Sequence, residues 1–149
     1  MSTFYYWEDF TAGSTFTLGE RIVTEEEIIA FAKQFDPQPF HINKEAAAAS
    51  HFGGLVASGW HTAAITMRIM VDEYLANSSS MGSPGIDNLR WLKPVRPGDT
   101  LKVSMDIVST RASQSRPNMG TVNSLWRVHN QHGEEVMTME GVTMFGRRP

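Results

Sequence analysis

The chain has 149 residues, a formal net charge of −3 and no cysteine, and 41% of its residues are hydrophobic. This size and composition are typical of one compact domain, so we expect a single domain over residues 1–149. Scattered basic residues give no nucleic-acid footprint, and no apolar run is long enough to span a membrane. The lack of cysteine excludes disulfides, thiolate catalysis and cysteine metal sites. Because the start of the sequence shows no leader-like pattern, a cytoplasmic location is expected.

The first part of the chain predicts a strand and two helices. Residues 14–24 are rich in β-branched and aromatic side chains and predict a strand. Thr24 and Glu27 have the spacing of a capping box, so a helix is expected to begin there. It is expected to end before Pro37, because the residue preceding a proline disfavours helical backbone. Asn43 then predicts the start of a short second helix.

A long helix is expected over residues 60–76, which contain neither proline nor glycine. Its apolar residues recur at helical spacing and are expected to form the buried face: Trp60, Ala64, Met67, Val71 and Tyr74. A more polar face is marked by His61, Arg68 and Asp72.

Beyond a Ser/Gly/Pro-rich connection at residues 77–85, the hydrophobic pattern changes from helical to alternating. It predicts strands over residues 100–108, 121–129 and, more weakly, 134–145. The order of strand, helices and several antiparallel strands favours an α+β fold. In such a fold, the long helix covers the apolar face of one antiparallel sheet.

The segment FDPQPFHINKEAA, residues 35–47, places a carboxylate and an imidazole five positions apart on a loop stiffened by two prolines. Asp36 and His41 could share a water and move its proton, since an imidazole changes charge near neutral pH. A fully extended chain would separate them by roughly 17 Å, so this requires the loop to curve. Spacing alone favours the structural alternative, a turn former and a packing residue, because isolated Asp and His pairs are common.

The segment GGLVASGWHTAA places Ser58 and Gly59 at the start of the long helix. Unpaired backbone N–H groups and the positive end of the helix dipole meet there, and can bind a carbonyl oxygen that becomes negative during a reaction. Taken alone, the more ordinary interpretation is that Ser58 caps the helix and Gly59 fits a tight turn.

The remaining polar candidates are weaker. His61 could face a pocket, and Arg90, Lys93 and Arg96 could meet a phosphate, but a structural or solvated role is the simpler interpretation for each. No pair of histidines has the spacing of a helical metal site, so no metal is expected.

These two segments, followed by LRWLKPVRPGDTL at residues 89–101, resemble the MaoC-like dehydratases, which include the R-specific enoyl-CoA hydratases. The resemblance implies the hot-dog fold, in which an antiparallel sheet wraps a long helix. It also implies a homodimer or larger homo-oligomer and, near residues 89–101, a strand, a turn and a strand.

The resemblance further implies that Asp36 and His41 activate water for addition to a 2-enoyl thioester. The Gly59 N–H would polarise the thioester carbonyl, and Ser58, Gln38 and Trp60 would complete the substrate site. CoA enters as part of the substrate, or acyl carrier protein replaces it, and no other cofactor is expected.

Two departures from the family pattern concern the substrate. Gln38 stands where the family signature has asparagine, and KQF at residues 33–35 replaces its small residues. These departures make hydratase or dehydratase chemistry a firmer expectation than the usual straight-chain substrate, and a branched or carboxylated acyl group is an alternative. The alternatives are a thioesterase of the same fold, or a non-catalytic acyl-CoA-binding module.

Overall fold

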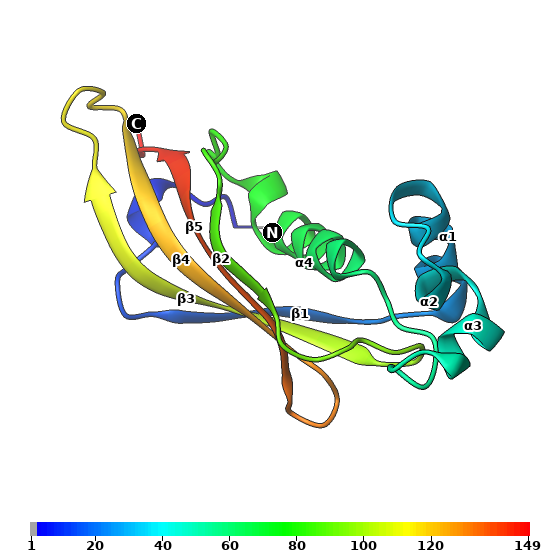
Figure 1. Cartoon of the computed structure of the whole chain (residues 1–149). Coiled ribbons are helices and arrows are strands. Elements are labelled where there is room, and N and C mark those ends of the chain that lie inside the picture. The colour runs from blue at the N-terminus through cyan, green and yellow to red at the C-terminus, as the bar shows by residue number, and fades with distance from the viewer. Residues whose placement is uncertain (1–2) are drawn as a thin grey trace.

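The structure, a computed structural model, describes residues 3–149 and is built on a five-stranded antiparallel sheet with the order β1-β3-β4-β5-β2. The strands are β1 (Thr15–Ile22), β2 (Ile86–Trp91), β3 (Thr100–Ala112), β4 (Met119–His129) and β5 (Glu135–Gly146). The sheet is strongly curved, and the long helix α4 (Gly59–Glu73) lies in its concave side (Figure 1). This arrangement confirms the predicted α+β class.

Alternating apolar residues form the concave face of the sheet, as their sequence period predicts. The register places Phe16, Met105, Trp126 and Met139 side by side across four strands. Met105 and Trp126 are almost completely buried, because α4 covers this row. Burying such large side chains stabilises the fold by about 1.5–3 kcal/mol each.

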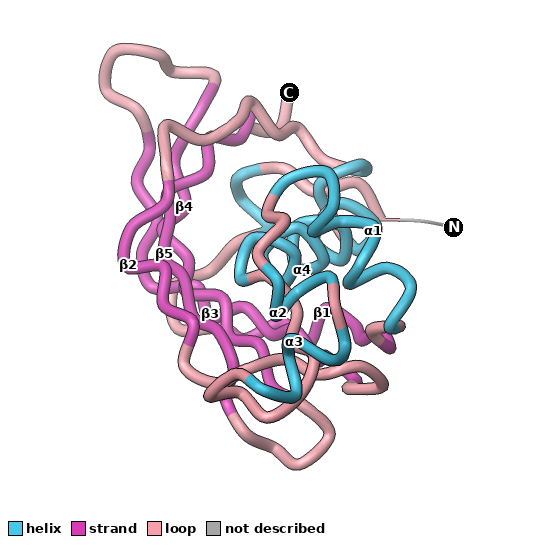
Figure 2. Tube along the Cα trace, turned by 45° about the vertical axis from the view of Figure 1, so that its right-hand side comes forward, coloured by secondary structure: helices cyan, strands magenta, loops and turns pink. Residues whose placement is uncertain are grey.

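Three shorter helices follow β1 and gather beside the start of α4 (Figure 2). They are α1 (Glu25–Phe35), α2 (Pro39–Ile42) and α3 (Lys44–Ala49). The capping box at the start of α1 is confirmed, because Thr24 accepts from the Glu27 N–H and Glu27 accepts from the Thr24 N–H. Asn43 likewise caps α3, through the N–H of Ala46. Two single-turn 3-10 helices, at Trp7–Asp9 and Leu75–Asn77, complete the structure.

The predicted buried face of the long helix is wrong. The buried side chains of the helix are instead His61, Thr62, Ile65, Thr66, Ile69 and Met70. Of the five residues predicted to be buried, Tyr74 is buried at the helix end, whereas Trp60 and Met67 are 59% and 46% exposed. We call the outward row of Trp60, Ala64, Met67 and Val71 the α4 stripe. Both sides of this helix carry apolar residues, so helical spacing did not identify the side that the sheet covers.

The end of α4 and the strand β2 also differ from the prediction. Helix α4 ends at Glu73 rather than at residue 76, and a 3-10 turn follows it. The residue pattern did not predict strand β2. The family resemblance did imply a strand, a turn and a strand near residues 89–101, where β2 ends and β3 begins. No helix in the described part of the chain is long and apolar enough to cross a membrane.

Candidate active site

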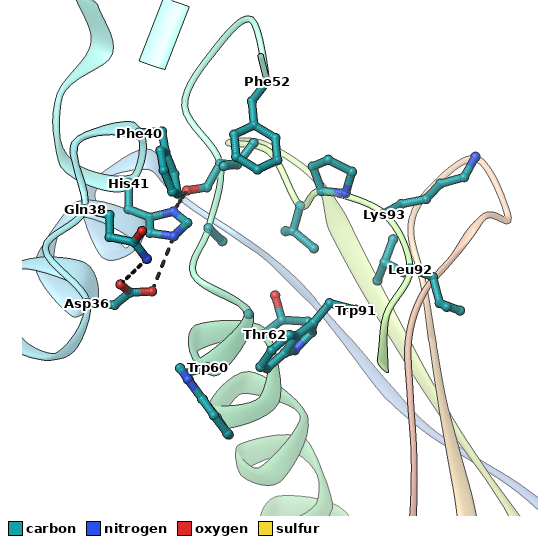
Figure 3. A pocket seen from close by; sticks show the side chains of 16 residues that line it. Asp36, Gln38, Phe40, His41, Phe52, Trp60, Thr62, Trp91, Leu92 and Lys93 are labelled. Carbon is teal, nitrogen blue, oxygen red and sulfur yellow. Dashed lines mark hydrogen bonds and ion pairs between the residues drawn. The ribbon is translucent and has the colours of Figure 1, made fainter. Parts of the chain in front are cut away.

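A cavity of about 410 Å³ opens where α2, the start of α4 and the segment after β2 converge. Its walls are mainly apolar, with Phe40, Phe52, Val56, Val95 and Val136 among the lining residues. A few polar side chains project into it, including those of Asp36, Gln38, His41 and Thr62 (Figure 3). An apolar pocket with a few convergent polar groups is the usual form of a small-molecule site.

Asp36 and His41 lie together on one wall of this cavity. The His41 Nε2 atom is 3.4 Å from Asp36 Oδ2, as drawn in Figure 3. The loop curves because Gln38 donates its backbone N–H to the Asp36 carbonyl and accepts from the His41 N–H, which starts the single turn of α2. Pro39 occupies the first position of this turn, where a missing N–H costs nothing. The rigid loop is therefore bent, and it brings the acid and the histidine together.

The Asp36 carboxylate is held by two further side chains. Ser58 donates its hydroxyl hydrogen to Oδ2 at 2.8 Å, and Gln38 donates its amide to Oδ1 at 2.8 Å. Desolvation tends to raise the pKa of Asp36, but the hydrogen bonds from Gln38 and Ser58, together with the nearby His41, outweigh it and hold that pKa below its ordinary value. Asp36 is therefore ionised at neutral pH and able to accept a proton or orient a water.

His41 is oriented from behind by the backbone. Its Nδ1 atom lies 2.6 Å from the Val56 carbonyl oxygen, which can only accept a hydrogen bond, so Nδ1 carries a hydrogen. In the neutral imidazole this leaves Nε2 as the acceptor, and Nε2 is the atom that faces Asp36. The ring is 7% exposed, so its orientation is fixed by packing as well as by this bond.

Ser58 joins this pair to the start of α4. As predicted, it caps the helix: its hydroxyl oxygen accepts from the Trp60 N–H at 3.3 Å. Its carbonyl oxygen accepts from both the His61 and Thr62 N–H groups. Among the N–H groups of the first helical turn, only that of Gly59 has no protein acceptor within residues 3–149. Gly59 also lines the cavity. A ligand oxygen can accept this hydrogen bond, and the helix dipole favours negative charge there.

Trp60 and Gln38, the other predicted site residues, also line the cavity. The sequence interpretation missed Thr62, whose side chain points into the cavity from the next helical turn, and Trp91, whose indole ring lies beside the helix start (Figure 3). The signal for Thr62 was a hydroxyl within an otherwise apolar stretch, and the signal for Trp91 was its place in the segment at residues 89–101.

The weaker candidates have structural roles. His61 stacks on Phe31 of α1, with ring centroids 4.8 Å apart, and does not line the cavity. Lys93 lies at the cavity wall but is paired with Glu134, and Arg96 donates to the Phe52 carbonyl at 2.7 Å. Within residues 3–149, no three His, Asp or Glu side chains gather as metal ligands would.

Several known proteins resemble this chain in sequence and in fold. The sequence model of the MaoC-like domain matches residues 10–128. A solved structure of a MaoC-like dehydratase from Rhodospirillum rubrum superposes with a TM-score of 0.89 at 42% identity, covering 97% of this chain and 99% of that one. Protein YdeM of Bacillus subtilis is 29% identical over 134 residues, which are 90% of this chain and 92% of YdeM. The 3-hydroxyacyl-thioester dehydratase Z of Mycobacterium tuberculosis is 28% identical over 113 residues, with coverages of 72% and 75%.

The curved sheet wrapped around one helix is the hot-dog fold, as the family resemblance implied. The chain belongs to the MaoC-like dehydratase family.

Proposed function

We propose that this protein is a hydratase or dehydratase that adds water to, or removes it from, the 2,3 double bond of an enoyl thioester carried by CoA or acyl carrier protein. The observation that carries the proposal is the Asp36–His41 pair, 3.4 Å apart on the wall of a cavity that also exposes the Gly59 N–H. One relative is named for dehydration of a 3-hydroxyacyl thioester, which supports this class of substrate.

In the hydration direction, the thioester carbonyl accepts a hydrogen bond from Gly59, which draws electron density away from C3. A water held between Asp36 and the Nε2 of His41 loses a proton to this pair and adds its oxygen to C3. The electron pair of the double bond moves onto the carbonyl oxygen, forming an enolate that the helix start stabilises. The proton taken from water is returned to C2, so the reaction consumes one water and leaves the protein unchanged.

The position of the acidic residues favours this chemistry over thioester hydrolysis by a carboxylate on the central helix. Helix α4 carries its acids, Asp72 and Glu73, at the end far from the cavity. Asp36 is the one carboxylate among the described residues that line the cavity.

The test is a panel of enoyl-CoA and 3-hydroxyacyl-CoA thioesters, analysed by mass spectrometry for a mass change of one water. Asp36→Asn should abolish turnover while the protein stays folded, as a cooperative thermal unfolding transition would show. The matched control is Asp72→Asn, the same change at an exposed acid of α4, which should keep full activity. Near-normal turnover in Asp36→Asn would contradict the proposal, and release of free thiol without a hydrated product would indicate a thioesterase. Tight binding of the thioesters without turnover would indicate a binding module.

We also propose that the protein is a homodimer. Within residues 3–149, β2 pairs only with β5 and its other edge is open. The exposed Trp60 of the α4 stripe contacts Trp91 of β2, with ring centroids 5.1 Å apart. An open edge beside exposed apolar side chains is a surface that proteins normally cover. A second copy covers both features at once through a two-fold interface.

A further inference from the structure

We propose that the Thr62 hydroxyl is a second hydrogen-bond donor to the thioester carbonyl oxygen, beside the Gly59 N–H. This inference rests on the proposed function and assigns a catalytic role to a residue one helical turn inside α4. The role requires that the hydroxyl be free, that it be close to Gly59, and that it find a partner in the substrate.

The usual acceptor of a helical threonine is already occupied at this position. A threonine within a helix commonly donates its hydroxyl to the carbonyl four residues earlier. Thr66, one turn further along α4, does so and bonds to the Thr62 carbonyl at 2.9 Å. For Thr62 the corresponding acceptor is the Ser58 carbonyl, which already accepts from the His61 N–H at 2.9 Å and the Thr62 N–H at 3.1 Å. A carbonyl has two lone pairs, so Ser58 has no capacity left for the hydroxyl.

The hydroxyl is also aimed at the site. Thr62 is only 3% exposed, yet it lines the cavity, and Figure 3 shows its oxygen directed into the cavity beside Trp91. Residues three apart on a helix are neighbours, and helical side chains lean toward the N-terminus. The Thr62 hydroxyl therefore lies over the first turn, on the side from which a ligand approaches the Gly59 N–H.

A thioester supplies the matching partner. Its carbonyl oxygen is an acceptor with two lone pairs, and it gains negative charge as water adds to C3. One donor from the backbone and one from Thr62 satisfy both lone pairs in a cavity whose other walls are mostly apolar. Fixed donors in such surroundings stabilise developing charge far more than water does.

The experiment compares Thr62→Val, which keeps the shape of the side chain and removes the hydroxyl, with Thr62→Ser, which keeps the hydroxyl. Thr62→Val should lower kcat about 100- to 1,000-fold, the range seen when one such donor is removed. Thr62→Ser should restore most of the rate. Thr66→Val, the same change at a threonine whose hydroxyl is already bonded within the helix, should retain the kcat of the unmodified protein.

A spectroscopic measurement separates a bond to the substrate from a packing effect. Butyryl-CoA labelled with carbon-13 at the carbonyl is a saturated ligand that cannot be hydrated. A hydrogen bond lowers the carbonyl stretching frequency, so the band of the bound ligand should move to higher wavenumber in Thr62→Val and stay in place in Thr66→Val. Asp36→Asn should also leave the band in place, because Asp36 does not contact the carbonyl in the proposed mechanism.

An unchanged band in Thr62→Val overturns the inference, whatever happens to the rate. A rate loss that serine does not restore overturns it too, and a shifted band with an unchanged kcat overturns the catalytic role. These results leave the proposed function intact if Asp36→Asn is inactive. No bound thioester band in the unmodified protein contradicts both the substrate class and this inference.

Discussion

The indole ring of Trp91 lies directly against the Cα atom of Gly59. A Cβ atom built on residue 59 would be only 2.4 Å from the ring atoms Cδ2 and Cε2 of Trp91. The glycine at the helix start therefore leaves space for the ring of Trp91, the last residue of β2. This ring lies beside the Gly59 N–H, which we propose polarises the substrate carbonyl. The packing between these two residues fixes both the start of α4 and one side of the cavity.

Gly59→Ala should consequently destabilise the protein, although alanine is normally favoured over glycine in a helix. Overpacking of this kind costs about 1–3 kcal/mol in the free energy of unfolding. The same substitution made in a Trp91→Ala background should cost little, because the clashing ring is gone. Chemical denaturation of the two single variants and the double variant measures this coupling.

Gly85→Ala is the control for the glycine change itself, since a Cβ there meets nothing within 4 Å. The interpretation of Gly59 fails if Gly59→Ala is equally destabilising with and without the indole of Trp91.

Gln38 should set the lower end of the pH range in which the proposed hydratase activity is seen. Its side-chain amide donates a hydrogen bond to Asp36 Oδ1 at 2.8 Å, and this bond helps to keep the pKa of Asp36 below its ordinary value. Removing this amide in Gln38→Leu should raise the Asp36 pKa. The acidic limb of the kcat/KM profile should then move to higher pH, because Asp36 takes up its proton earlier as the pH falls.

Gln34→Leu, at an exposed glutamine of α1, is the matched control and should leave the limb in place. Superimposable acidic limbs for Gln38→Leu and the unmodified protein would show that this hydrogen bond does not set the pKa of Asp36.

The lowered pKa of Asp36 also affects the stability of the fold. A carboxyl whose pKa is depressed in the folded state stabilises that state above its unfolded pKa of about 3.9, and this stabilisation is lost as the pH falls through the folded value.

Much of the sheet could be predicted because each strand carries its own pattern. In β3, Leu101, Val103 and Met105 alternate with polar residues, and all three are buried. Alternation assigns side chains to faces without any knowledge of the partner strand. Strand β2 lacks this signal: its residues are mostly exposed, and its place at the edge is set by pairing with β5.

The site could be predicted only in part, because its geometry depends on contacts between distant segments. The acid and the histidine were visible in sequence, but their approach to 3.4 Å needs the turn of α2 and the Val56 carbonyl, fifteen residues from His41. The cap at Ser58 was predictable from local chemistry, whereas its bond to Asp36, 22 residues away, was not.

The α4 stripe gives a direct test of the proposed homodimer. Met67 is 46% exposed at the middle of the stripe, and a charge placed there would be buried unpaired in a two-fold interface. Met67→Glu should therefore convert the protein to monomers, as measured by analytical ultracentrifugation. Val108→Glu introduces the same charge at an apolar residue of β3 that is 54% exposed, and should leave the assembly unchanged. A Met67→Glu protein that sediments like the unmodified one would place the interface elsewhere.

His61 should make the stability of the fold depend on pH. It is buried between α4 and Phe31 of α1, and its Nδ1 atom has no hydrogen-bond partner within residues 3–149. Burial lowers the pKa of His61; the charge of Glu27 opposes this effect and that of Arg21 adds to it. Because the folded pKa is depressed, the unfolded chain binds the proton first as the pH falls. The free energy of unfolding should thus be fully retained above about pH 6.5 and decrease below it, by at most about 1.4 kcal/mol per pH unit for this group.

Urea denaturation at a series of pH values from 8 to 5 measures this dependence, and His61→Leu removes it. Leucine keeps the apolar contact with Phe31 and removes the titratable imidazole, so the variant should lose this part of the decrease at acidic pH. His51→Leu, at an exposed histidine, should behave like the unmodified protein. If the stability of His61→Leu falls with pH as steeply as that of the unmodified protein, another group is responsible for the decrease. A shallower decrease in His61→Leu alone would identify the packing of α1 against α4 as the acid-sensitive contact, and α1 is the helix that ends at Asp36.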